Sequence, residues 1–149
     1  MAFTARNAVP EDAPLLSTLE AASFSEPWSE SAIAAHLASP NSFTKIAVMA
    51  DGTAVGYIFG LLLGDEAELL RVAVLPAYRS LGIGFWLVDA FLFHLAGDGP
   101  KTCFLEVRKS NVGARHLYEN HGFYEVGVRK NYYKNPTEDA IIMRHDREK

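Results

Sequence analysis

The amino-acid sequence predicts one α/β domain (α+β mixed), in which the strands form a single mixed sheet and helices pack against it. The first observation is length, because 149 residues correspond to about one domain of ordinary size. The second is pattern, because short apolar runs typical of strands are interspersed with longer segments of helical periodicity. The third is continuity, because no repeat, low-complexity tract or linker divides residues 1–149. One domain is therefore expected to span the whole chain.

The first predicted elements are one strand and two helices. The strand covers residues 3–8. A helix follows, because Pro10 suits a first helical turn and apolar residues recur at helical spacing as far as Ala22. Ser29 can cap a second helix, which ends before Pro40.

Three strands are expected next, in direct succession. The dipeptide Asp51-Gly52 lies between two apolar runs, and such a pair is a strong hairpin signal. The two runs cover residues 43–50 and 54–63, and a third strand covers 68–74. Strands joined by such short turns predict an antiparallel meander.

The second half of the chain predicts two further helices and three further strands. Residues 82–96 are almost all apolar, a pattern that predicts a helix buried on most of its circumference. A strand at 101–108 completes a β-α-β crossover around that helix. A helix at 111–121 ends at Gly122. Two strands complete the prediction, at 123–130 and 140–144.

Composition and charge argue against several classes of protein. Fourteen Lys and Arg against eighteen Asp and Glu give a formal charge of -4, which offers no electrostatic footprint for a nucleic acid. The longest stretch without a charged residue or histidine, residues 52–64, is shorter than the roughly 18 to 20 residues of a membrane-spanning helix, so no membrane association is expected. The single cysteine and the absence of a signal-like apolar start favour the cytoplasm. The sequence does not indicate an oligomeric state.

A turn with two glycines, Arg-Ser-Leu-Gly-Ile-Gly at residues 79–84, stands between a strand and the long apolar helix. Glycines let a backbone approach a ligand closely, and a helix N-terminus offers free N–H donors, so the turn can hold a phosphate or pyrophosphate. A Walker loop would need Gly-Lys-Ser/Thr, and a dinucleotide fingerprint would need a third glycine where Leu87 stands. A tight turn into a core helix remains the alternative interpretation.

Two ionisable side chains are candidates for acid-base chemistry. Glu106 lies in mid-strand, on the face that it shares with Phe104 and Arg108. A glutamate in an apolar cleft would have its pKa raised towards the range of a general base. Tyr118 lies two helical turns after Asn111, on the same helix face. An ion pair for Glu106 and simple packing for Tyr118 remain open alternatives.

Nucleophilic and metal chemistry have less support. Cys103 falls on the apolar face of its strand, and nothing in the sequence supplies the base that a thiolate needs. The five histidines show no ligand spacing with cysteines or carboxylates, so no metal is predicted.

The turn at residues 79–84, with the strand before it, resembles the Q/R-x-x-G-x-G/A turn of the GNAT acetyltransferases. The resemblance continues through Leu-Glu-Val-Arg-Lys-Ser-Asn at 105–111 and through residues 114–123, so that it covers about the C-terminal half. Arg71 departs from it by interrupting an otherwise apolar strand. The implied fold is the GNAT fold, a central mixed and mostly antiparallel β-sheet flanked by about four helices.

The resemblance implies an acetyl-CoA-dependent N-acetyltransferase that works by direct transfer in a ternary complex. Glu106 would be the general base and Tyr118 the general acid. Acetyl-CoA would be held along a strand, around the turn and by one helix cap, at Val72, Ala73, Val74, Arg79, Ser80, Leu81, Gly82, Ile83, Gly84, Phe85 and Asn111.

Four segments, 24–29, 105–108, 131–133 and 138–143, are similar to those of the RimI group, the N-terminal alanine acetyltransferases of a small-subunit ribosomal protein. This similarity implies a peptide or protein N-terminus as acceptor, with Trp28 and Tyr132 lining its groove. A GNAT acetyltransferase of a small amine or polyamine remains open. A non-catalytic acyl-CoA-binding module also remains, although the joint presence of Glu106 and Tyr118 weighs against it.

Overall fold

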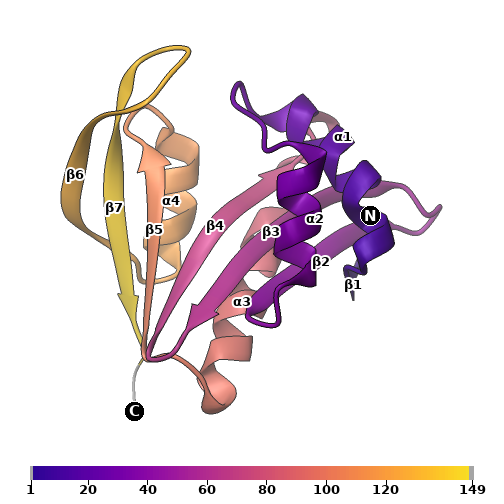
Figure 1. Ribbon diagram of the computed structural model, residues 1–149, viewed down its shortest axis with the longest axis horizontal. Helices are drawn as coiled ribbons and strands as arrows, with labels where there is room; N and C mark the ends of the chain where they lie inside the picture. The colour runs from indigo at the N-terminus through magenta and orange to yellow at the C-terminus, as the bar shows by residue number, and fades with distance from the viewer. Residues whose placement is uncertain (1, 148–149) are drawn as a thin grey trace.

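The computed structural model describes residues 2–147, which form one sheet with helices on both faces (Figure 1). Its seven strands are β1 Phe3–Asn7, β2 Ser42–Met49, β3 Ala54–Leu63, β4 Glu66–Val74, β5 Thr102–Arg108, β6 Tyr124–Tyr133 and β7 Glu138–Asp146. Its four α-helices are α1 Ala13–Ser23, α2 Glu30–Ala38, α3 Ile83–Asp98 and α4 Val112–Asn120. Short 3-10 turns lie at Pro10–Asp12 and Pro76–Tyr78. The strand order is β1-β2-β3-β4-β5-β7-β6.

All the predicted strands and helices are present, with differences at their ends. The meander β2-β3-β4 is antiparallel, and the crossover through α3 makes β4 and β5 a parallel pair. The hydroxyl of Ser29 accepts the N–H of Ala32 at 3.1 Å, as expected of a helix cap. The C-terminal hairpin differs most, because β6 continues to Tyr133 and β7 already starts at Glu138. The predicted mixed, mostly antiparallel sheet is confirmed.

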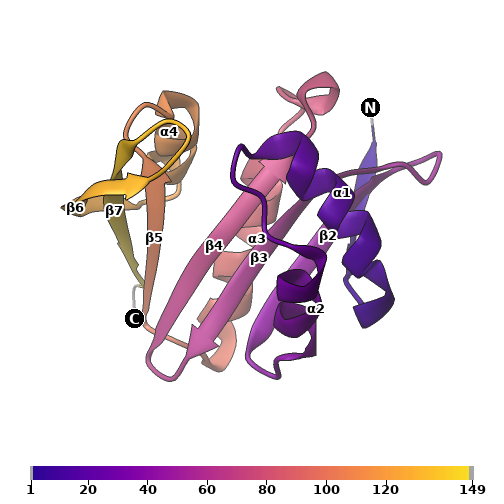
Figure 2. The same ribbon diagram turned by 45° about the horizontal axis from the view of Figure 1, so that its top comes forward.

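Helices α1 and α2 cover one face of the sheet, and α3 and α4 cover the other, as Figure 1 and Figure 2 show. A hydrophobic core lies on each face of the sheet. The side chains of strand β3 alternate between the two faces, so β3 contributes to both cores. Tyr57 and Phe59 pack with Leu16 of α1, whereas Ile58 packs with Phe91 of α3. The sheet therefore separates two apolar layers.

The prediction that the helix at 82–96 is buried on most of its circumference is wrong. Leu87 and Phe91 are fully buried against the sheet, but Phe93 is 81% exposed. Phe85 and Trp86 are exposed as well. A single sheet contacts α3 from one side only, so its apolar composition overstates its burial.

Strands β4 and β5 pair over a short distance and then separate (Figure 1). Residues 66–69 pair with residues 102–105, and within the described chain the two strands have no further pairing. β4 nevertheless continues to Val74 and β5 to Arg108. The edge of β4 that faces β5 is consequently without a strand partner beyond Leu69.

A β-bulge in β4 lies at the point of separation. Gly60 of β3 opposes Leu69, and Phe59 opposes Arg71, so Leu70 is an extra residue in β4. Bulges bend a strand and increase its local twist, and they recur next to active sites. The bulge therefore accounts for the direction in which β4 leaves β5.

The extra residue also reverses the alternation of side chains along β4. Leu69, before the bulge, belongs to the core under α3, and beyond it Val72 and Val74 belong to that same core. Arg71 consequently points to the opposite face, where its Nε lies 3.6 Å from Oε1 of Glu20 on α1.

Candidate active site

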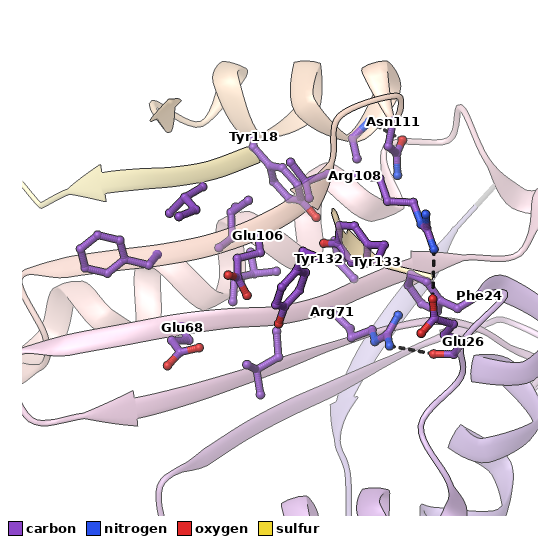
Figure 3. A pocket seen from close by; sticks show the side chains of 18 of the residues that line it. Phe24, Glu26, Glu68, Arg71, Glu106, Arg108, Asn111, Tyr118, Tyr132 and Tyr133 are labelled. Atoms are coloured by element: carbon purple, nitrogen blue, oxygen red, sulfur yellow. Dashed lines mark hydrogen bonds and ion pairs between the residues drawn. The ribbon is translucent and has the colours of Figure 1, made fainter. Parts of the chain in front are cut away.

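A cavity of about 1180 Å³ lies where β4 and β5 separate (Figure 3). Its lining comes from both strands, from the segment that joins α1 to α2, from α4 and from β6. The structure thus brings together six of the residues singled out in the sequence, namely Trp28, Val72, Glu106, Asn111, Tyr118 and Tyr132.

Glu106 and Tyr118 reach this cavity from opposite faces of the sheet. β5 alternates as predicted, because Cys103, Leu105 and Val107 are buried in the core under α3. Glu106 lies on the other face of β5, whereas Tyr118 comes from α4, beneath the sheet. The two side chains line one space because the sheet is open between β4 and β5 (Figure 3).

Glu106 forms an ion pair in this structure. Its Oε2 accepts a hydrogen bond from Nε of Arg129 on β6. The side chain of Glu106 is 29% exposed and that of Arg129 is 57% exposed, so the pair lies at the mouth of the cavity. The ion-pair alternative is therefore realised, and the purely apolar surroundings considered for Glu106 are not.

Tyr132 and Tyr133 lie near this carboxylate, and Tyr118 lies near Tyr133. Burial raises the pKa of Tyr118 well above its ordinary value, and the neighbouring Tyr133 acts in the same direction. Burial and the charge of Glu106 raise the pKa of Tyr133 to about 12. Burial, followed by the charge of Glu106, also raises the pKa of Tyr132. All three phenols keep their protons at neutral pH, so each can donate a hydrogen bond.

Cys103 lies apart from this chemistry. It is 1% exposed, and burial raises the pKa of its thiol to about 12. A thiolate nucleophile therefore has no support at this position. Among the described side chains, those of residues 2–97 and 99–147, no group of three or more His, Cys, Asp or Glu is placed to hold a metal ion. Within the same range, no helix is long and apolar enough to cross a membrane.

The glycine turn leads from the end of β4 into α3, outside the lining of the cavity. Gly82 caps the helix with φ of 81°, a left-handed conformation that suits glycine. Ile83 is 1% exposed, so its side chain belongs to the core and its main chain alone is available to a ligand. The first N–H groups of α3 lack partners within the helix. The residues assigned to cofactor binding that the lining does not include are Ala73, Val74, Arg79, Ser80, Leu81, Gly82, Ile83, Gly84 and Phe85.

Three of the residues with an expected cofactor role have structural partners. Nε of Arg79 donates to the carbonyl of Val74 at 3.0 Å. The ring of Phe85 lies against that of His121, tilted by 35° and with centroids 4.1 Å apart. Oδ1 of Asn111 accepts the N–H of Ala114 at 3.2 Å and so caps α4 at the rim of the cavity.

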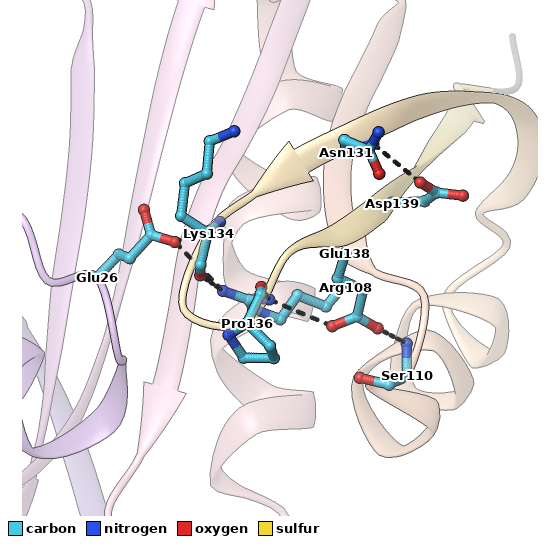
Figure 4. A network of polar contacts seen from close by, with 8 residues as sticks. All are labelled: Glu26, Arg108, Ser110, Asn131, Lys134, Pro136, Glu138 and Asp139. Carbon is cyan, nitrogen blue, oxygen red and sulfur yellow. Dashed lines mark hydrogen bonds and ion pairs between the residues drawn. The ribbon is translucent and has the colours of Figure 1, made fainter.

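Sequence reasoning did not assign site roles to residues that hold the loop between β6 and β7. Arg108 donates to the carbonyls of Lys134 and Pro136 at 2.7 and 3.0 Å, and it lies 3.2 Å from Glu138 (Figure 4). Glu26 accepts the N–H of Lys134 at 2.6 Å. The alternation of side chains along β5 predicted that Arg108 lies on the same face as Glu106. Its hydrogen-bond partners could not be predicted, because they are far away in the sequence.

Comparisons with known proteins agree with this geometry. The sequence profile of the Acetyltransferase (GNAT) family matches residues 13–123. The [ribosomal protein bS18]-alanine N-acetyltransferase of Haemophilus influenzae is 38% identical over 104 residues, which are 68% of this chain and 70% of that protein. The crystal structure of the ribosomal-protein-S18-alanine N-acetyltransferase from Escherichia coli has a TM-score of 0.91 and 31% identity, covering 99% of this chain and 96% of that chain.

A more distant structure shares the fold. Arabidopsis thaliana NAA60, solved in complex with acetyl-CoA, has a TM-score of 0.88 at 17% identity, over 97% of this chain and 98% of that chain. The resemblance of the sequence to the RimI group is confirmed by the first two relatives, as is the predicted class of enzyme, an acetyl-CoA-dependent N-acetyltransferase. This chain belongs to the GNAT family of acetyltransferases.

Proposed function

We propose that this enzyme transfers the acetyl group of acetyl-CoA to the N-terminal amine of a small-subunit ribosomal protein that begins with alanine. The observation that carries the proposal is the cavity between β4 and β5, which Glu106 and Tyr118 line together. The names of the bacterial relatives support the acceptor, because both act on the alanine of ribosomal protein S18. Such a reaction belongs in the cytoplasm, where ribosomal proteins are made.

Acetyl-CoA would bind along the unpaired edge of β4. Its extended pantetheine arm can hydrogen-bond to the main chain of Val72, Ala73 and Val74, much as a peptide adds to a sheet edge. Its pyrophosphate would lie at the N–H groups that begin α3, around the turn from Arg79 to Phe85. Asn111 would contact the cofactor from the start of α4.

The acceptor would enter between the α1–α2 segment and β6, where Trp28 and Tyr132 line the cavity. The cavity as a whole favours a cation, because four glutamates and three arginines line it and two of the glutamates have no ion-pair partner among residues 2–147. An α-amino group, with an ordinary pKa near 7.7 to 8.0 against about 10.4 for lysine, also loses its proton more easily. The four glutamates are Glu26, Glu66, Glu68 and Glu106.

The chemical step would use the two groups from opposite faces of the sheet. Glu106, directly or through one water, takes the proton of the acceptor ammonium. The free amine attacks the thioester carbonyl and the C–N bond forms. The nitrogen then releases its second proton to solvent, from which Tyr118 later regains the proton it donates, and the C–S bond breaks. Tyr118 donates its proton to the departing CoA thiolate, and burial keeps that proton in place at neutral pH. No acetylated side chain is needed, which agrees with the inert Cys103.

Two substitutions at Gly84 test the cofactor site. A Cβ at Gly84 would meet Leu117 and Val74 at 3.6 and 3.8 Å, which are ordinary contacts, so Gly84→Ala should bind acetyl-CoA like the parent. Gly84→Asp adds a negative charge to the helix N-terminus and should weaken binding at least about tenfold. Calorimetry measures both affinities. Equal affinity of a folded Gly84→Asp variant would show that the pyrophosphate lies elsewhere.

Removal of the proposed base should affect the chemical step. Glu106→Gln keeps the shape of the side chain but not its basicity, so kcat should fall by about 10²- to 10⁴-fold while acetyl-CoA affinity stays within about twofold. Glu125→Gln is the matched control, because Glu125 also pairs with an arginine, Arg115, but lies outside the cavity lining. The assignment fails if the two variants have the same kcat.

The proposed acid makes a different prediction about pH. Tyr118→Phe should slow expulsion of the thiolate and lower kcat, whereas Tyr124→Phe, at an exposed tyrosine of β6, should not. Because burial raises the pKa of Tyr118, the parent should show no descending limb from this group below about pH 10. Stopped-flow measurement of a single turnover across this range checks both points. Parental single-turnover rates in Tyr118→Phe would make the tyrosine a packing residue.

The choice of acceptor can be tested by competition. A peptide that begins with a free alanine should be acetylated faster than spermidine, and faster than the same peptide with a blocked N-terminus and an internal lysine. Mass spectrometry of equimolar mixtures measures the three products. Preferred acetylation of spermidine would assign the enzyme to the small-amine acetyltransferases, and preferred acetylation of lysine would contradict the N-terminal acceptor.

A further inference from the structure

A buried carboxyl group holds one wall of the cavity but takes no part in acetyl transfer. Residues 24–28 line the cavity without forming a helix or strand. Their anchor is Glu20 of α1, which is fully buried. One of its oxygens accepts the N–H of Trp28 at 2.7 Å, and the other accepts the hydroxyl of Tyr57. Removing a carboxyl group from water is costly unless it is paired, so these partners are essential.

Arg71 joins this anchor to residues 24–28, and Figure 3 shows its contact with Glu26. Its Nε lies 3.6 Å from Oε1 of Glu20, and its Nη2 donates to the carbonyl of Glu26 at 3.0 Å. Its guanidinium carbon lies 4.1 Å from the ring centre of Phe24 and 5.8 Å from that of Trp28. One planar cation therefore contacts the beginning, the middle and the end of the wall.

We propose that Arg71 is a positioning residue that fixes residues 24–28 as the acceptor wall and thereby determines how tightly, and with which first residue, an acceptor peptide binds. The inference rests on the proposed N-terminal acceptor. Arginine suits this role better than lysine, because its planar fork can pair with a carboxylate, donate to a carbonyl and stack on a ring at once.

The opposite wall is coupled to this one. Arg108 fixes the loop between β6 and β7 through the carbonyls of Lys134 and Pro136 (Figure 4). The side chain of Glu26, whose carbonyl Arg71 holds, accepts the N–H of Lys134. A shift of residues 24–28 would therefore also disturb the β6–β7 loop on the opposite side of the proposed acceptor site. The proposed cofactor edge of β4 has no part in these contacts.

Kinetics of two variants at position 71 test the role of Arg71. Arg71→Met removes the positive charge and the N–H donors of the guanidinium group. It should raise the acceptor KM at least about tenfold while the acetyl-CoA KM stays within about twofold. The preference for alanine over leucine as first residue should fall by a similar factor. Arg71→Lys keeps the charge and should recover part of both losses.

Arg6→Met is the matched control. Arg6 also pairs with a buried carboxylate, Asp12, at 2.8 Å, but it lies before α1 and outside the cavity lining. This variant should lose stability while both KM values and the first-residue preference stay parental. Equal changes in Arg6→Met and Arg71→Met, or parental acceptor kinetics in folded Arg71→Met, would overturn the proposal. If Arg71→Met does not fold, parental acceptor kinetics in Arg71→Lys would overturn it.

Hydrogen exchange separates this inference from the proposed function. The amide of Trp28 should exchange faster in Arg71→Met, and to a lesser extent in Arg71→Lys, than in the parent or in Arg6→Met. Unchanged exchange in both Arg71 variants would overturn the positioning role. If the parent does not acetylate N-terminal peptides, the proposed function fails, and faster Trp28 exchange would still show that Arg71 fixes the wall.

Discussion

The candidate active site depends on two parallel strands that stop pairing. β4 and β5 share hydrogen bonds as far as Leu69 and Leu105 and then diverge, which leaves main-chain groups of β4 without a strand partner. Such groups cost free energy when they are buried unpaired, so an opening of this kind persists where solvent or a ligand can satisfy them. It allows Glu106, above the sheet, and Tyr118, from below it, to share one cavity. A continuous sheet would keep them in separate layers.

Much of the fold could be predicted because its signals are local. The Asp51-Gly52 turn and the alternation of β5 are both as expected. The bulge at Leu70 could not be predicted, because no glycine or proline stands at this point of β4 itself. The bulge exists only relative to the register of β3, where Gly60 lies opposite Leu69. The exposure of Phe93 could not be predicted either, because the apolar sequence of a helix does not indicate how many of its sides pack against other elements.

The candidate site divides in the same way. Glu106 and Tyr118 could be named because strand and helix periods, together with family motifs, point to them, although their catalytic roles remain predictions. Arg71 was visible as a charge in an apolar strand, but its purpose depends on the bulge that turns it towards Glu20. Arg108 likewise needs carbonyl groups of the loop at 134–136, which no local pattern connects to β5.

The acidic lining of the cavity has a consequence for turnover. Carboxylates such as Glu66 and Glu68, which lack ion-pair partners among residues 2–147, attract an ammonium group. Acetylation converts that ammonium into a neutral amide, so the attraction disappears in the same step that forms the product. In the proposed reaction, acetylation thus weakens the binding of the modified protein to the enzyme and favours its dissociation.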